Sequence, residues 1–520
     1  MRIGMTNVGR SKRAWGILLA APLLAALTSP AGAKPAANDG FLTQEEVFIT
    51  MADGLPAGAT ARAIISSGDT VGDFMFEGLP DGMGVRPGTD KHTVDVYVAH
   101  EQTTVPFFGS SDFQDASVSK LTLTTKGGPN QGSVLGASVV LGPEEGFLRF
   151  CSASIAGPDE GLSHYLFLTG EETNDIVEVP AGASYGPDPG LGTARQGGFA
   201  VGLDTDTGEF AAIAGMGRLN HENTIVVPGG WDDFALLTTD DTFNAPSAQL
   251  YLYLAATEGD ILGDGGSLHA LRITSDNGQA VDPTNAFNGA NDYLDLAVGD
   301  EFAGEFIPVP EDVARGTTGI APQDALEDWS NDNNIFQAIR LEDLAYDKND
   351  PRVIYIADTG RSRVVPDPDT GRMQRGPGGT VGSADNGRIF KMVMNADDPT
   401  IVDSLTVLAD GDAVGTDAYV PFTSPDNLDT SKKSLMVQED TGNASIWQHR
   451  FNQESWRVVA TVNDERGESS GIVDASKWFG QGAWLLDVQG HGNRIEEELV
   501  NGILLKRESG QVILMRVPAS

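Results

Sequence analysis

The chain has 520 residues, and its 74 acidic side chains outnumber 34 basic ones, which gives a formal net charge of −40 at pH 7. Nucleic acid and anionic membrane surfaces repel so negative a chain, so we expect neither as a partner. The length excludes a single small core, and 63 glycines, 27 prolines and short apolar runs favour an all-β fold.

Residues 1–33 are typical of an export signal. An apolar segment over 16–27 leads to Ala31-Gly32-Ala33, which has the form of a cleavage site. Four basic side chains precede the apolar segment: Arg2, Arg10, Lys12 and Arg13. The apolar segment is shorter than the ~20 residues of a membrane-spanning helix. We therefore predict cleavage after Ala33, a periplasmic or secreted protein without membrane insertion, and one domain over 34–520.

Strand-length apolar runs with polar or acidic residues at one end recur along this domain. They cover 95–99, 164–168, 224–227, 353–357, 434–438 and 483–488. Alternating segments at 387–394, 444–451 and 510–517 are expected to be the last strands of their units. About six repeats of a four-stranded meander, with polar dipeptides at one end of the first strand, predict a six-bladed β-propeller. An array of two-sheet β-sandwiches is the structural alternative.

The segment 217–254 shows the pattern of one unit. His221-Glu222 precedes the apolar run 224–227, and Pro228-Gly229-Gly230 marks a turn. A second run ends at Asp240-Asp241, and a third, over 249–254, alternates between apolar and polar residues. We expect an antiparallel meander here, with its polar strand ends facing a central channel.

The segment 263–336 fits the repeat poorly. Strands are expected over 267–273 and 304–310, and a short helix over 322–332. We predict that this segment is an insertion that lies over the channel mouth.

Cys151 is the only cysteine of the chain, which excludes an intramolecular disulfide. A single cysteine is either a small buried apolar residue or a metal ligand. The sequence has no phosphate-binding P-loop, no His-Glu-x-x-His helix and no Gly-x-Ser-x-Gly turn, so the usual signature of serine hydrolases is missing.

Five segments, in order, resemble the signature blocks of bacterial PhoX-type alkaline phosphatases. They are Phe150-Cys151-Ser152-Ala153, Leu168-Thr169-Gly170-Glu171-Glu172, Gly217-Arg218-Leu219-Asn220-His221-Glu222, Arg340-Leu341-Glu342-Asp343 and Ser424-Pro425-Asp426-Asn427-Leu428. His100-Glu101-Gln102-Thr103 resembles an earlier block of that family. The resemblance covers most of the chain after residue 96.

The resemblance implies a six-bladed propeller whose channel holds ferric and calcium ions and hydrolyses small-molecule phosphate monoesters. Transferred position by position, it implies that Cys151 and Glu222 bind iron. It also implies that Glu172, Glu342 and Asp426 bind calcium, and that Arg340 binds the phosphate group. Oxygen ligands suit calcium and a thiolate suits iron.

Three features depart from the family pattern. The segment after Cys151 lacks a tryptophan pair, Gly170 stands in place of a cysteine, and Asp240-Asp241-Thr242 lacks an arginine. Two alternatives therefore stay open: a non-catalytic calcium-binding exported propeller, and a calcium-dependent hydrolase of another ester or a lactone.

The residues alone also allow purely structural roles. Glu342-Asp343 and Asp426-Asn427 could bind backbone N–H groups in turns. Arg340 could pair with carboxylates on a solvated rim. His100 and His221 are expected to bridge strand ends, with no ligand role.

Overall fold

The computed structural model describes residues 40–242, 247–453 and 455–518, and strands dominate it. The export signal predicted for residues 1–33 lies outside the described residues. The predicted meander over 217–254 is present: β16 (His221–Val227), β17 (Phe234–Asp240) and β18 (Leu250–Ala255) pair antiparallel in that order. The apolar runs therefore form strands where the alternation predicted them.

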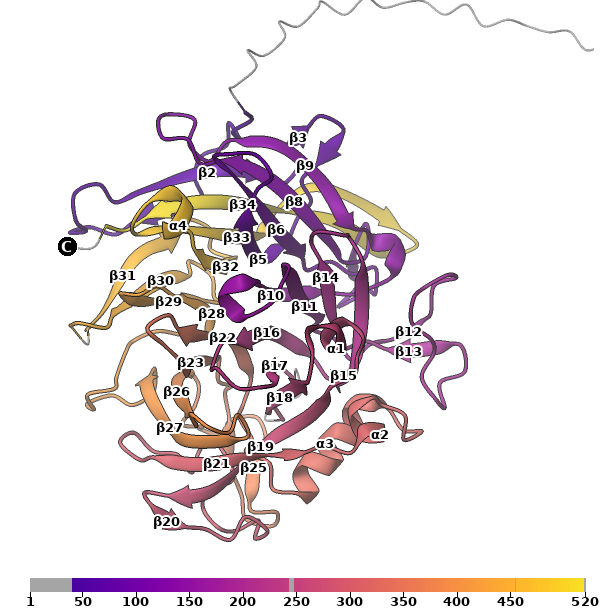
Figure 1. Ribbon diagram of the computed structural model, residues 1–520, viewed down its shortest axis with the longest axis vertical. Coiled ribbons are helices and arrows are strands. Elements are labelled where there is room, and N and C mark those ends of the chain that lie inside the picture. Colours follow the sequence, from indigo (N-terminus) through magenta and orange to yellow (C-terminus); the bar gives the residue numbers. More distant parts are fainter. Residues whose placement is uncertain (1–39, 243–246, 454, 519–520) are drawn as a thin grey trace, which may run out of the picture. The chain divides into compact units, whose positions relative to one another are not determined.

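The same antiparallel meander recurs along the described chain, and each copy has four strands from the channel outward (Figure 1). The first two are β5 (Pro80–Pro87), β6 (Thr93–His100), β8 (Ser117–Thr124), β9 (Val134–Leu141), and β10 (Phe150–Ala156), β11 (Leu166–Glu171), β14 (Phe199–Asp204), β15 (Phe210–Arg218). β19 (Ser267–Asp276) completes the meander of β16, and next come β22 (Leu341–Asp347), β23 (Asp350–Asp358), β26 (Arg388–Met394) and β27 (Ile401–Asp410). The last two are β28 (Pro425–Thr430), β29 (Ser434–Glu439), β30 (Ser445–Arg450), β31 (Ser455–Val462), and β32 (Gly467–Asp474), β33 (Ala483–Val500), β34 (Ile503–Arg516), β2 (Thr60–Ser66).

The innermost strands close a ring. Each contacts the next in the order β5, β10, β16, β22, β28 and β32, and β32 contacts β5 again. Apolar residues between neighbouring sheets form the core, as in the group of Ile225, Leu237 and Leu344. The predicted all-β propeller is thus confirmed. The blade number of six stays a prediction, because β21 (Phe302–Pro308) joins two meanders into one ten-stranded sheet.

The N-terminal part of the described chain completes the last meanders. β2 pairs with β34, and β1 (Ile49–Met51) pairs with β31. Ile64 and Ile65 of β2 are fully buried, and each such side chain stabilises the fold by about 1.5–3 kcal/mol. Chain closure therefore depends on contacts between residues more than 400 positions apart.

The prediction that 387–394, 444–451 and 510–517 are last strands was wrong. These segments form β26, β30 and the end of β34, which are third strands. The outermost strands β27, β31 and β2 follow them in the sheets. Outermost strands are partly exposed at the rim, so apolar and polar residues alternate less clearly along them. The sequence pattern therefore did not identify them as a fourth strand after each third strand.

The helix predicted over 322–332 is confirmed as α3 (Pro322–Asp332), with proline in its first turn as helices favour. It packs on the end of β17: Gln323 Nε2 donates to Thr242 Oγ1 at 2.9 Å, and Gln249 Nε2 donates to Glu327 Oε2 at 3.0 Å. The helix therefore lies beside a strand end that faces the channel. Its place over the channel mouth stays a prediction.

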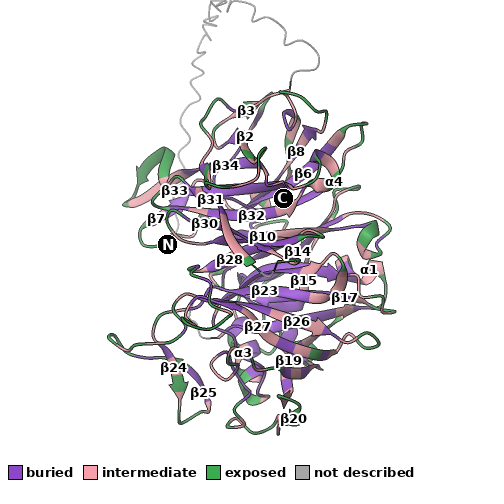
Figure 2. Ribbon diagram, turned by 90° about the vertical axis from the view of Figure 1, so that its left-hand side faces the viewer, coloured by how far each residue is buried: buried purple, intermediate pink, exposed green. Residues whose placement is uncertain are grey.

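Shorter elements lie in the connections within and between the meanders (Figure 2). The strands are β3 (Thr70–Val71), β4 (Phe74–Met75), β7 (Ser110–Asp112), β12 (Ile176–Glu178), β13 (Ala194–Gln196), β20 (Gln279–Ala280), β24 (Val364–Asp367) and β25 (Arg372–Arg375). The helices are η1 (Pro143–Glu145), η2 (Pro158–Glu160), α1 (Glu258–Leu262), α2 (Glu311–Ala314) and α4 (Ser476–Phe479). No helix among the described residues is long and apolar enough to cross a membrane.

Candidate functional site

Five innermost strands begin with the same register shift. In β16, His221 faces Asp240 and Thr224 faces Thr238, so three steps on β16 span two steps on β17. The equivalent shifts lie in β5, β10, β22 and β28. Such a β-bulge adds one residue and turns a side chain out of the sheet. The first bulge residues, which we call the bulge ring, are Asp81, Cys151, Glu222, Glu342 and Asp426.

A second set of residues, the strand-end ring, follows the second strand of each of these meanders. Its members are Glu101, Glu172, Asp241, Thr359 and Asp440. The backbone N–H of each member donates to the carbonyl oxygen of the residue just before the innermost strand of the same meander, as Glu172 N does to Arg149 O at 3.0 Å. Because neighbouring strands run antiparallel, the end of the second strand lies beside the start of the first. Glu101 and Glu172 thus follow second strands, so the prediction that the polar dipeptides stand at one end of the first strand is wrong for these two residues.

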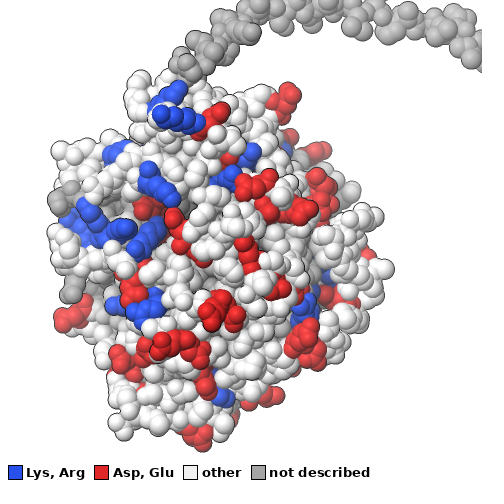
Figure 3. Space-filling model, in the orientation of Figure 1, with Lys and Arg blue, Asp and Glu red and all other residues white. Residues whose placement is uncertain are grey.

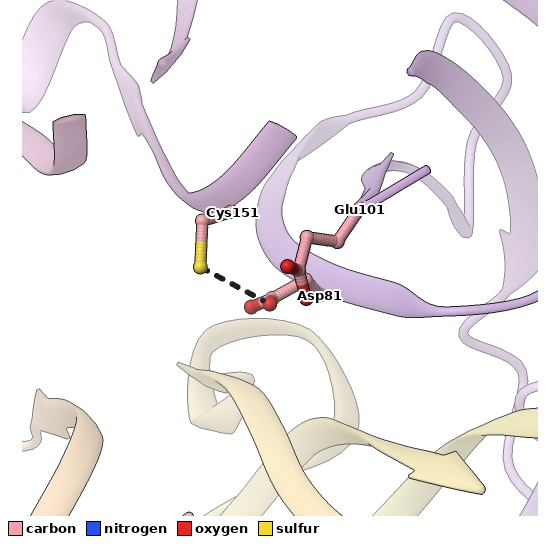
Figure 4. A group of neighbouring side chains, drawn as sticks. All are labelled: Asp81, Glu101 and Cys151. Atoms are coloured by element: carbon pink, nitrogen blue, oxygen red, sulfur yellow. Dashed lines mark hydrogen bonds between the residues drawn. The ribbon is translucent and has the colours of Figure 1, made fainter. Parts of the chain in front are cut away.

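The two rings meet in the channel. Ligand atoms of Cys151, Glu172 and Glu222 lie within 4.8 Å of one another, and so do those of Glu222, Glu342 and Asp426. Asp81, Glu101 and Cys151 form a further group, shown in Figure 4, in which Cys151 Sγ donates to Asp81 Oδ2 at 3.4 Å. All five residues that the sequence suggested as metal ligands are thus brought together from four meanders.

Asp81 was missed by the sequence analysis, which named Glu101 only within a family-like block and gave it no ligand role. Gln489 Nε2 joins them, donating to Asp81 Oδ2 at 2.8 Å and to Glu101 Oε2 at 3.2 Å. Asp81 stands between Pro80 and Gly82, which reads as an ordinary turn. The equivalent bulge positions of the other meanders are the signal that could have found it.

The carboxyl groups of the channel have raised pKa values. Burial, followed by neighbouring carboxylates, raises the pKa of Asp81, Glu172, Glu342 and Asp426 well above the ordinary range. Burial also raises the pKa of Glu222 to about 8. Among the described residues, Asp81 Oδ1, both Glu222 oxygens and Asp426 Oδ1 are buried without a hydrogen-bond partner. Buried carboxylate oxygens without partners are costly unless a cation binds them.

The donor set fits metal ions. Burial, and then the charges of Asp81 and Glu222, raise the pKa of the Cys151 thiol well above its usual value. A thiolate can exist there only beside a positive ion. Carboxylate oxygens suit hard cations such as calcium, and one sulfur beside them suits a transition metal such as iron.

Arg340 lies among the rings rather than on a solvated rim. Its Nε donates to Asp241 Oδ1 at 2.7 Å, a second bond joins Nη2 to Asp241 Oδ2, and Glu342 Oε1 lies 3.5 Å from Nη2. Only 14% of the Arg340 side chain is exposed. Asp241, from the triplet that lacks the family's arginine, therefore holds an arginine supplied by the next meander.

The second bulge residues link innermost strands just beyond the bulge ring, both neighbouring strands and, through Asn427 of β28 and Ser152 of β10, strands that are not adjacent in the ring. Asn223 donates to Asp343 Oδ1, Leu428 N donates to Asp343 Oδ2 at 2.8 Å, and Asn427 donates to Ser152 Oγ. Gly82 occupies the same position in β5, where a Cβ would lie 1.9 Å from Ala153 N. Asp343 therefore binds its neighbouring strands and Asn427 binds the non-adjacent strand β10, and neither takes part in the metal-binding groups.

The first residue of each polar pair at a second-strand end is structural, because successive side chains of a strand face opposite sides. Arg195 Nη2 donates to Glu171 Oε1 at 2.6 Å, and both side chains are fully buried. Ile339 N donates to Asp358 Oδ2 at 2.9 Å. His100 binds Gly78 O through Nδ1 and Ser119 through Nε2, as expected for a histidine without a ligand role.

Glu171→Gln and Glu172→Gln should therefore have opposite consequences. Glu171→Gln breaks the buried pair with Arg195 and should lower the free energy of unfolding by about 3–5 kcal/mol. Glu172→Gln removes one of several repelling carboxylates, so the metal-free protein should keep or gain stability while it loses metal affinity. Urea unfolding of both metal-free variants tests this, and equal destabilisation would refute the division of roles.

A cavity of about 1060 Å³ opens at the other ends of the innermost strands, where its walls include Val85, Tyr346 and Asp474. None of the metal-binding candidates lines it. The size of this cavity does not make it the chemical centre, since the unpartnered oxygens lie in the rings.

Figure 3 shows Lys and Arg side chains gathered at one side of a face that is otherwise rich in acidic residues.

Comparison with known proteins gives a matching family model and similar solved structures. The family model described as alkaline phosphatase PhoX matches residues 166–477. The structure of Pseudomonas fluorescens PhoX in complex with vanadate is similar, with a TM-score of 0.60 and 15% identity over 91% of this chain and 97% of that chain. Penicillium chrysogenum α-L-arabinanase complexed with arabinobiose reaches a TM-score of 0.35 and 8% identity over 87% of this chain and 98% of that chain. No curated protein sequence matches the chain.

Proposed function

Because this chain belongs to the PhoX family of alkaline phosphatases, we propose that it hydrolyses small-molecule phosphate monoesters at a metal centre between its two rings. The observation that carries the proposal is the meeting of Cys151, Glu172, Glu222, Glu342 and Asp426 in the channel. Residues 1–33, which are typical of an export signal, support a periplasmic or secreted location.

The proposed ligand roles follow the donor chemistry. Cys151 and Glu222 would hold iron, because they bring a sulfur and a carboxylate together. Glu172, Glu342 and Asp426 would hold calcium through oxygen. Such ions would supply a nucleophile near neutral pH and neutralise charge on the phosphoryl oxygens.

The chain itself positions the phosphate through Arg340. Asp241 occupies Nε and Nη2 of the guanidinium, which fixes its plane, and no hydrogen bond from the described residues occupies Nη1, which can donate to a phosphoryl oxygen. Since Arg340 is largely buried, this charge would act with little screening by water. Asp241 is thus a positioning residue, and Arg340 is the proposed phosphate-binding residue.

We expect the protein purified from its own host to contain iron and calcium and to release p-nitrophenol from p-nitrophenyl phosphate. Arg340→Gln should lower kcat/KM by about 100-fold or more, since it removes a preorganised donor. Arg352→Gln is the matched control, because Arg352 pairs with Asp350 at the far end of β23. Elemental analysis and steady-state kinetics make the measurement.

One other outcome would favour the second candidate function. A Cβ at Gly170 would lie 2.3 Å from the Cβ of His221, so this site cannot take the family's cysteine without a shift of β16. This departure from the family is the reason to consider the alternative functions.

Protein that binds calcium, lacks iron and hydrolyses no phosphomonoester, phosphodiester or lactone would be a non-catalytic calcium-binding propeller. Hydrolysis of a diester or lactone alone would indicate a related calcium-dependent hydrolase.

A further inference from the structure

Three arginines gather beside the strand-end ring; we call Arg361, Arg363 and Arg375 the arginine group. Arg361 follows ring member Thr359 by two residues, so its Cα lies within about 7 Å of that ring residue. Arg363 immediately precedes β24, and Arg375 of β25 faces Val364 across the hairpin. Gly376 N donates to Arg363 O at 2.8 Å, which holds the two arginines at the same end of this hairpin.

The backbone of this group is anchored. Arg361 N donates to Ala384 O at 2.8 Å. Gly360 has φ +72°, and a Cβ there would lie 2.6 Å from Ala384 O. In Figure 2, β24 and β25 project from the opposite side of the described chain to α1 and α4. α4 carries Trp478, which lines the cavity at the other ends of the innermost strands, so the arginine group lies on the side of the rings.

The arginine group has no acidic partner within residues 40–242, 247–453 and 455–518: no ion pair or side-chain hydrogen bond involves any of its members. Most other arginines of these segments form an ion pair, as Arg388 does with Asp410 at 2.6 Å, and others bond carbonyl oxygens, as Arg372 does with Ile335 O at 2.7 Å. Unpaired cations are unexpected in a chain with 74 acidic and 34 basic residues. Clustered like charges repel one another, and a bound anion would relieve that repulsion.

Arg361 is within electrostatic reach of the proposed phosphate-binding residue. Burial lowers the pKa of Arg361, and so do the charges of Arg340 and Arg375, whereas Asp241 raises it. Arg340 already has carboxylate partners in Asp241 and Glu342. The guanidinium N–H groups of the arginine group are therefore additional hydrogen-bond donors near Arg340, and a phosphate bound at Arg340 would not occupy them.

We propose that the arginine group is a second anion subsite at the channel mouth, which makes the site selective for phosphate esters whose alcohol part carries another anionic group. This inference rests on the proposed phosphatase function. A carboxylate or a second phosphate fits the planar donor geometry of arginine. Esters of neutral alcohols use only the Arg340 site.

The test compares 3-phosphonopropionate with propylphosphonate, two non-hydrolysable probes that differ in one carboxylate. Titration calorimetry on the metal-loaded protein should give the first probe about tenfold or greater preference. The triple variant Arg361→Gln/Arg363→Gln/Arg375→Gln should lose that preference and keep its affinity for propylphosphonate. An unchanged melting temperature would show that the variant is folded.

The control variant is Lys432→Gln/Lys433→Gln, which removes two exposed cations beside the far cavity and should keep the preference. Equal affinity of the wild type for both probes, failure to bind either, or full preference in the triple variant would overturn the inference. Turnover of p-nitrophenyl phosphate is measured separately. A wild type that hydrolyses it without discriminating the probes refutes only the subsite, and one that discriminates them without turnover refutes only the phosphatase proposal.

Discussion

Dialysis against a chelator at pH 8 should lower the melting temperature of this protein by about 10 °C or more. Ions that bind only the folded chain add about 4 kcal/mol per site at a thousandfold excess over the dissociation constant. Without them, the carboxylates of the two rings repel one another in a buried channel, where Asp426 Oδ1 and both Glu222 oxygens lack partners within the described residues. Differential scanning calorimetry with chelator and with millimolar calcium makes the measurement.

The fall in melting temperature on metal removal should depend on pH, and the pKa shifts determine whether it grows or shrinks as the pH rises. Burial and neighbouring carboxylates raise the folded-state pKa of Asp81, Glu172, Glu342 and Asp426 above the unfolded values, and burial raises the pKa of Glu222 to about 8. Groups of this kind contribute stability that is fully present below the unfolded pKa and is lost as pH rises through the folded pKa. The metal-free melting temperature should therefore fall between pH 5 and pH 8.

Calcium-loaded protein should show a much flatter profile over the same range, because bound ions replace the protons. A chelator that changes nothing at pH 8 would mean that the acidic residues form only a solvated surface. A metal-free melting temperature that rises with pH would contradict the buried, protonated carboxyl groups.

Cys151→Ser should abolish phosphomonoester hydrolysis and remove iron, while the stabilisation by calcium survives. Among the described residues, the Cys151 sulfur is the only soft ligand in the three groups of possible metal ligands in the channel, whereas the carboxylates of Glu172, Glu342 and Asp426 remain to bind calcium. Any ferric charge-transfer absorption should disappear with the iron. Elemental analysis, visible spectra and the calorimetric calcium shift are measured on the same preparation.

The contrary outcome for this variant is equally specific. If Cys151 only packs in the core, serine costs at most about 1–3 kcal/mol through a buried hydroxyl. Metal content and turnover would then stay at the wild-type level. Cys151 is the only cysteine, so a single thiol titration confirms the substitution and the reduced state of the wild type.

Much of the fold and of the candidate site could be read from the sequence. Apolar runs such as 353–357 are local patterns. A strand with one or both faces buried needs apolar residues at fixed spacings, so the run can be recognised in the sequence. The acidic residues beside these runs, including Glu172, Glu222 and Asp426, were visible in the sequence, but only the resemblance to PhoX-type phosphatases implied metal-binding roles for them. The helix over 322–332 was equally predictable, because its start and its apolar spacing are local.

Only the tertiary structure decided which polar residues share the channel. Glu171 and Glu172 are neighbours in sequence, yet one binds Arg195 and the other faces the rings, because their side chains point to opposite sides of β11. The bulge that aims Asp81 depends on pairing with β6, and closure of the ring depends on β2 meeting β34. Register and closure come from contacts between residues far apart in the chain, and no local pattern of residues records those contacts.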